Sequence, residues 1–132
     1  MKLERKAIMG KRIIILVICI AISIGFYLTI FNHTKIMVND VKLITVDNNQ
    51  YNLDVDNEKV AKIISMFNKA RRFTKNVDTT PSHRILIELK DGRKIEIWGN
   101  TQSFQYVNEN GKNYKILSKD LADYFRSLDK AQ

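Results

Sequence analysis

The chain has 132 residues, enough for one compact domain of ordinary size but not for an enzyme with a separate cofactor domain. Lys and Arg outnumber Asp and Glu by 22 to 14, and half of the net charge of +8 lies before residue 35. The single cysteine argues against a disulfide framework within one chain and against a cysteine-based zinc site with four ligands.

Residues 13–31 read IIILVICIAISIGFYLTIF, a stretch of 19 residues without a charged side chain. As a helix this stretch is roughly 28 Å long, close to the ~30 Å hydrocarbon core of a bilayer. The upstream flank, residues 1–12, is basic, whereas the downstream flank is almost neutral. The positive-inside rule therefore predicts a basic cytoplasmic tail (1–12), one transmembrane helix (13–31) in contact with membrane lipid, and a C-terminal part outside the cell membrane.

Two other interpretations of this apolar stretch are less favoured. A cleaved signal peptide has a shorter apolar region and a cleavage site between small residues, whereas this run is long and continues into the bulky residues Phe26 to Phe31. A lipoprotein reading of Cys19 is disfavoured because Ile18, which precedes it, is not small. We therefore expect an uncleaved signal-anchor.

After a predicted linker, residues 32–40, the remaining residues 41–132 have the composition of a globular domain. Two alternating segments, 41–46 and 51–55, flank Asn48-Asn49, a pair that tolerates the positive φ of a type I′ turn. The pattern predicts a hairpin in which Val46 lies opposite Tyr51 and Ile44 lies opposite Leu53.

A helix is expected next, capped by Asp56 and running to about Arg72. Its apolar positions have the spacing of one buried stripe, formed by Val60, Ile63, Ile64 and Phe67. Residues 74–82 contain Asp, Thr and Pro and are predicted to form a loop.

Two further hairpins are predicted from the separation of polar and apolar faces. In residues 84–98, a three-residue loop, Lys90-Asp91-Gly92, places Ile87 opposite Ile95 and Ile85 opposite Ile97. In residues 103–117, the same criterion favours the loop Glu109-Asn110-Gly111, with Tyr106 opposite Tyr114 and Phe104 opposite Ile116.

A last helix, capped by Ser118, turns Leu121, Tyr124, Phe125 and Leu128 inward. The element order is β-β-α-β-β-β-β-α. This order predicts an α+β fold in which one face of an antiparallel sheet packs on two helices.

The sequence offers few residues for catalysis. His83 begins a predicted strand, and the neighbouring Ser82 points to the opposite side of an extended chain, so the two do not form a nucleophile and base. The carboxylates at 54, 56 and 58 are explained by a helix N-terminus. We expect no catalytic residue, no metal site and no cofactor, and hence a protein that is not an enzyme.

Two surfaces are candidate binding sites. Lys62, Lys69 and Arg72 project from the first long helix away from its apolar stripe and form a basic face, which either is simply solvated or binds anionic headgroups or cell-wall polymer. The outward face of the sheet carries a second set near one end: Arg84, Leu86, Trp98 and Leu117. Trp98 either stacks with Arg84 as local structure or anchors a partner protein.

A charged stub, one span and a cysteine-free outer domain resemble the layout of small membrane-anchored proteins of Gram-positive bacteria. The sequence thus predicts a single-pass membrane protein whose extracytoplasmic domain, without catalysing a reaction, binds a partner protein or another envelope component. Nucleic acid is not an expected partner because the domain lies outside the membrane. Two alternatives are a membrane-tethered immunity or inhibitor protein and, more weakly, an envelope hydrolase.

Overall fold

A computed structural model of the chain describes residues 2–31, 33–74, 80–99, 102 and 104–131. These residues fall into two compact units, Met1–Asn32 and His33–Gln132. The two units are described separately below.

The first unit is a single helix, α1 (Lys2–Phe31). Its segment Met9–Phe26 is long and apolar enough to cross a membrane, and its large apolar side chains are exposed on all sides of the helix. A helix that is apolar all round needs apolar surroundings. In the part of the chain that the structure describes, this is the one such helix, and it has the character of a membrane anchor or a signal sequence.

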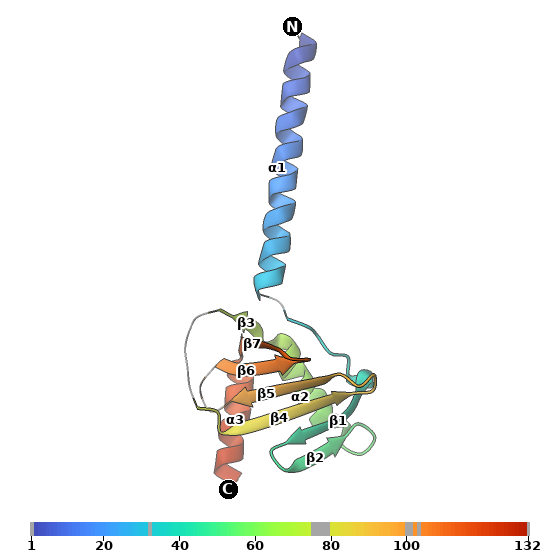
Figure 1. Cartoon of the computed structure of the whole chain (residues 1–132), viewed down its shortest axis with the longest axis vertical. Coiled ribbons are helices and arrows are strands. Elements are labelled where there is room, and N and C mark those ends of the chain that lie inside the picture. Colours follow the sequence, from blue (N-terminus) through green and yellow to red (C-terminus); the bar gives the residue numbers. More distant parts are fainter. Residues whose placement is uncertain (1, 32, 75–79, 100–101, 103, 132) are drawn as a thin grey trace. The chain divides into compact units, whose positions relative to one another are not determined.

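The second unit has an α+β fold, which confirms the predicted class. Seven strands form one antiparallel sheet in the order β2-β1-β4-β5-β6-β7-β3, and helices α2 and α3 lie on the same face of it (Figure 1). The elements are η1 (Val38–Asp40), β1 (Val41–Val46), β2 (Asn49–Asn52), α2 (Asn57–Lys69), β3 (Arg71–Phe73), β4 (His83–Leu89), β5 (Lys94–Gly99), β6 (Phe104–Glu109), β7 (Lys112–Leu117) and α3 (Lys119–Ala131).

The core lies between the sheet and the two helices. We call the helix-covered face of the sheet the inner face. Alternate residues of β4 and β5 point into it because successive side chains of a strand point to opposite sides. Its fully buried side chains are mostly isoleucines, Ile44, Ile85, Ile87, Ile95, Ile97 and Ile116, and they pack with Ile63, Ile64, Phe67, Leu121 and Phe125 of the helices.

The first hairpin forms with a different register from the one predicted. Val46 lies opposite Asn49 and Ile44 lies opposite Tyr51, so the turn is Asp47-Asn48. Asp47 adopts a φ of 52°, and its Oδ1 accepts a hydrogen bond from the backbone N–H of Arg84 at 3.0 Å. This hydrogen bond to β4 stabilises the turn at Asp47-Asn48. The prediction was wrong by two residues, a shift that leaves each side chain on its predicted face.

Helix α2 buries the predicted stripe, but it ends at Lys69 and not near Arg72. Ala70 has an extended backbone, and Arg71–Phe73 pair with β7 as the short strand β3. Backbone hydrogen bonds to the edge of β7 stabilise this segment as a strand. Because they join residues far apart in the sequence, helix periodicity does not reveal them. Of the predicted loop 74–82, residues 75–79 lie outside the described residues.

The β4–β5 hairpin confirms its predicted register: Ile87 lies opposite Ile95, and Ile85 lies opposite Ile97. Gly92 has a φ of 94°, the left-handed conformation that the three-residue loop requires.

The β6–β7 hairpin does not follow the prediction. Tyr106 lies opposite Lys115, and Val107 lies opposite Tyr114. The turn is the two-residue pair Asn110-Gly111, in which both residues have positive φ, 51° and 84°. This turn matches strand twist better than the three-residue loop does. The register therefore differs by one residue and turns Phe104 and Tyr106 to the face opposite the helices.

Helix α3 confirms its predicted cap, since the Leu121 N–H donates to Ser118 Oγ at 3.0 Å. The segment expected as a linker, residues 32–40, contributes to the folded unit from His33 onward. Ile36 is buried, its N–H donates to Asn68 Oδ1 at 2.8 Å, and its carbonyl accepts from Asn68 Nδ2 at 2.7 Å. The chain therefore enters the domain through specific contacts with α2.

Candidate functional site

The face of the sheet turned away from α2 and α3, here called the outer face, carries the second predicted set of residues. Arg84 lies opposite Trp98, and its guanidinium carbon is 5.3 Å from the centroid of the indole ring. Glu96 Oε2 accepts hydrogen bonds from Arg84 Nε at 3.2 Å and from Trp98 Nε1 at 3.0 Å. The predicted stacking is present, and it fixes the indole while leaving Trp98 39% exposed.

Leu86 and Leu117 also lie on the outer face. Leu86 is opposite Glu96 in β5, and Leu117 is opposite Phe104 in β6. Phe104 stacks on Phe73 of β3, with ring centroids 5.8 Å apart. Leu117 remains 41% exposed beside this aromatic pair. Together with Trp98, these residues give the outer face an apolar strip across neighbouring strands.

A hollow of about 260 Å³ opens next to this strip. Trp98 and Tyr106, which lie opposite each other on β5 and β6, contribute aromatic surface to it. Asn108 and Asn113 contribute amides, and Asn108 Nδ2 donates to Asn113 Oδ1 at 2.8 Å. Glu96, Val107, Tyr114 and Lys115 also line the hollow.

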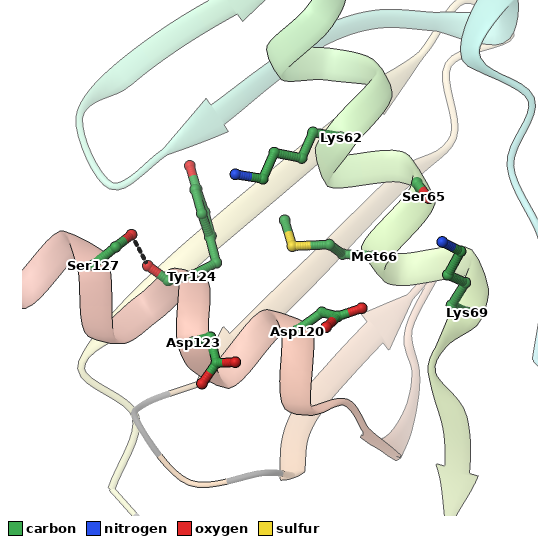
Figure 2. Close-up of a pocket in the computed structure, with 8 residues that line it drawn as sticks. All are labelled: Lys62, Ser65, Met66, Lys69, Asp120, Asp123, Tyr124 and Ser127. Atoms are coloured by element: carbon green, nitrogen blue, oxygen red, sulfur yellow. Dashed lines mark hydrogen bonds between the residues drawn. The ribbon is translucent and has the colours of Figure 1, made fainter.

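The predicted basic face has a different setting from the one expected. Figure 2 shows Lys62 and Lys69 on one wall of a hollow of about 430 Å³ between α2 and α3. The other wall carries Asp120 and Asp123 of α3. Asp123 is paired with Arg126, whose Nη1 lies 2.8 Å from its Oδ1. Acidic and basic side chains therefore meet at this hollow, and the face is not uniformly basic.

The same hollow contains Tyr124, whose ring packs 6.2 Å from that of Phe125. Burial raises the pKa of Tyr124 to about 12, and the nearby Tyr51 and Asp47 act in the same direction. Its phenol is therefore neutral at physiological pH.

Arg72 does not belong to the surface of α2. It lies on β3, opposite Ile116, and its guanidinium carbon is 5.3 Å from the centroid of the Tyr114 ring. Because the helix ends before it, Arg72 packs at the edge of the sheet.

His83 has closer partners than the sequence indicated. It is 4% exposed, its Nδ1 lies 2.8 Å from Asp47 Oδ2, and its Nε2 lies 2.5 Å from Asp129 Oδ1. Its ring stacks on Phe125 with 5.7 Å between centroids. Burial lowers the His83 pKa, but the hydrogen bonds and the charge attraction to Asp47 and Asp129 together raise it by more, and the net pKa lies above 6.5. With both ring nitrogens held by carboxylates, His83 links the β1–β2 turn to α3, and neither nitrogen is placed to take a proton from a nucleophile.

Of the described residues that line the outer hollow, sequence reasoning named only Trp98 as a candidate; the missed residues include four on the outer faces of β6 and β7, Tyr106, Asn108, Asn113 and Lys115. The Asn110-Gly111 dipeptide would have located them, because a two-residue turn at this pair sets the register that places all four on the outer face. Among the described residues, His, Cys, Asp and Glu form no cluster of three or more able to hold a metal ion.

Comparisons with known proteins place this chain in no characterised group: no family model, no curated protein and no solved structure matches it.

Proposed function

We propose that the chain is a single-pass membrane protein with a cytoplasmic N-terminus and that its folded unit is an extracytoplasmic binding module. The module binds a partner in the cell envelope through the outer face and catalyses no reaction. The proposal has two parts, the orientation of the anchor and the surface that binds.

The orientation is supported by charge. Five Lys or Arg and one Asp or Glu precede residue 13, whereas the segment just after the apolar stretch is almost neutral. Positive charge is retained on the cytoplasmic side of a span. The folded unit then lies outside.

The observation that carries the binding role is the outer face itself. Neither α2 nor α3 covers it (Figure 1), and Trp98 and Leu117 are exposed there beside a formed hollow. Exposed aromatic and apolar side chains gathered beside fixed polar groups are typical of a binding surface. The hollow between α2 and α3 also has an aromatic side chain, Tyr124, but that ring is half-buried against Phe125, and four charged residues line the hollow with it.

Orientation is tested by labelling single cysteines on intact cells with a membrane-impermeant maleimide, in a background where Cys19 is replaced by Ala. Lys130→Cys, at an exposed position of α3, should be labelled on intact cells. Lys11→Cys should be labelled only after the cells are opened. Labelling of Lys11→Cys alone on intact cells would reverse the orientation.

Binding is tested by photo-crosslinking on intact cells, with p-benzoylphenylalanine at position 117 or, as the matched control, at position 62. Benzophenone inserts into C–H bonds, so it captures a protein or a glycan. A discrete higher-mass product from position 117 but not from 62 supports the outer face. A product from 62 alone, or from neither position, contradicts it.

A further inference from the structure

The two aromatic side chains of the hollow on the outer face, Trp98 and Tyr106, are held in place by neighbouring side chains. Trp98 is held by Glu96 and by the Arg84 guanidinium, at 3.0 Å and 5.3 Å respectively. The Tyr106 ring meets Phe104 edge-on with 6.0 Å between centroids. Since these side chains are already ordered, a ligand that enters the hollow does not have to order them.

The charge of the lining is close to balanced. Among the described residues, Glu96 is the one carboxylate that lines it, and its Oε2 already accepts hydrogen bonds from Arg84 and Trp98. Lys115 is the one cation among the described residues that line it, and its other polar groups, the amides of Asn108 and Asn113 and the phenols of Tyr106 and Tyr114, are uncharged. A ligand carrying several charges of one sign finds no matching set of opposite charges here.

Aromatic surface beside amide groups suits a ligand with apolar C–H groups on one side and hydroxyls around its rim. The faces of aromatic rings are negative and attract polarised C–H groups, while amides and an ammonium group bind hydroxyls. A sugar ring has this chemistry. The hollow, at about 260 Å³, is also smaller than the roughly 300–1,000 Å³ typical of sites for drug-sized ligands, so one ring is the natural unit.

We infer that this hollow binds a neutral sugar ring of an envelope glycan, with Trp98 and Tyr106 as the stacking surface and Asn113 and Lys115 as hydroxyl partners. The inference rests on the proposed function, because it takes the outer face as the binding surface and places it outside the membrane, where envelope glycans lie.

The chain contains a single tryptophan, Trp98, so its fluorescence reports directly on this hollow. The full chain is purified in a detergent without a sugar headgroup and titrated with two neutral probes, the β-linked trimers of N-acetylglucosamine and of glucose. At least one trimer should produce a saturable change in Trp98 emission.

The variants distinguish the loss of a contact with the sugar from a general loss of folding. Tyr106→Ala and Asn113→Ala should each weaken the response by about tenfold. Tyr106→Phe retains the ring and should respond like the wild type, as should Gln50→Ala, a control on β2 at the far end of the strand order. Circular dichroism confirms that each variant is folded.

The inference is overturned if neither trimer changes Trp98 emission saturably, or if Tyr106→Ala and Asn113→Ala both respond like the wild type. A response to poly(glycerol phosphate) alone also overturns it, because the ligand would then be anionic. If the crosslink at position 117 forms while both neutral trimers fail, the ligand class is wrong and the proposed function stands. If the crosslink at position 117 is absent as well, both the sugar-binding inference and the proposed function are wrong.

Discussion

The two faces of the sheet differ in how far their side chains are exposed, and two consecutive residues of strand β5 show this difference. Ile97 points to the inner face and is fully buried, whereas its neighbour Trp98 points to the outer face and is 39% exposed. Ile97 lies opposite Ile85, and Trp98 lies opposite Arg84. The same strand therefore contributes to the core and to the outer face that we propose as a binding surface, and substitutions on the two faces should have separable effects.

The energetic scales of the two faces differ. Full burial of one aliphatic side chain stabilises a fold by about 1.5–3 kcal/mol. A cross-strand pair on a solvated face contributes about 0.2–1 kcal/mol. Stability should therefore depend mainly on the inner face.

The largest effect is expected from Ile97→Ala. Truncating a fully buried isoleucine leaves a cavity and should lower the free energy of unfolding by about 2–5 kcal/mol. Urea denaturation of a fragment covering residues 33–132, followed by circular dichroism, measures the change. The matched control is Lys94→Ala, an exposed position on the same strand. If Ile97→Ala lowers the free energy of unfolding by less than this control does, the inner face does not dominate stability.

Gly99→Ala should have the next largest effect. A Cβ at this inner-face position would lie 2.6 Å from Phe125 Cε2 and 2.8 Å from Gln105 Cγ. Both atoms belong to buried side chains, so the added methyl should cost about 1–3 kcal/mol through overpacking. The same denaturation measurement checks it. If the urea concentration at the midpoint of unfolding is unchanged, α3 accommodates the methyl group without a loss of stability and the prediction is wrong.

A pH effect is expected from His83, a buried titratable residue on the inner face. Its folded pKa lies above its ordinary 6.5, so the protonated form stabilises the fold. That stabilisation is present below about pH 6.5 and is lost as the pH rises through the folded pKa.

The test compares the wild type with His83→Gln at about pH 6 and about pH 9. The stability advantage of the wild type should shrink at the higher pH. Asp129→Asn, which removes one carboxylate partner, should reduce this pH dependence. An advantage that is constant or grows with pH would contradict the assigned role of the Asp47–His83–Asp129 contacts.

The smallest effect on stability is expected from Trp98→Ala. It removes the cross-strand pairs with Arg84, which includes the cation–π contact, and with Tyr106, together with the hydrogen bond to Glu96, a loss of about 1 kcal/mol. Thermal unfolding of wild type and variant side by side is sufficient. A loss as large as that of Ile97→Ala would mean that the outer face is part of the core.

The sequence predicted the inner face better than the outer one, and the hairpins show why. In β4–β5, polar and apolar residues alternate cleanly, and only one register keeps Ile85, Ile87, Ile95 and Ile97 together. In β6–β7, aromatic residues suit both faces. The apolar pattern then favoured the wrong loop, while the turn preference of Asn110-Gly111 determined the structure.

Long-range contacts explain the other differences. Nothing local marks Asp47 as a turn residue that binds Arg84, or Arg71–Phe73 as a strand that completes the sheet edge. The predicted surface residues of β4, β5 and β7 do share the outer face. Lys62 and Lys69 were correctly placed outside the stripe, but their acidic counterparts on α3 are 50 or more residues away in sequence.

The most direct test of the central claim uses the two neighbouring residues of β5 in one experiment. Crosslinking from p-benzoylphenylalanine at position 117 is measured on intact cells for Trp98→Ala and for Ile97→Val, a milder core change that should cost about 0.5–1.5 kcal/mol. Product should be lost in Trp98→Ala, although its fold is nearly as stable as the wild type, and retained in Ile97→Val. Product retained in Trp98→Ala and lost in Ile97→Val would contradict a binding surface on the outer face.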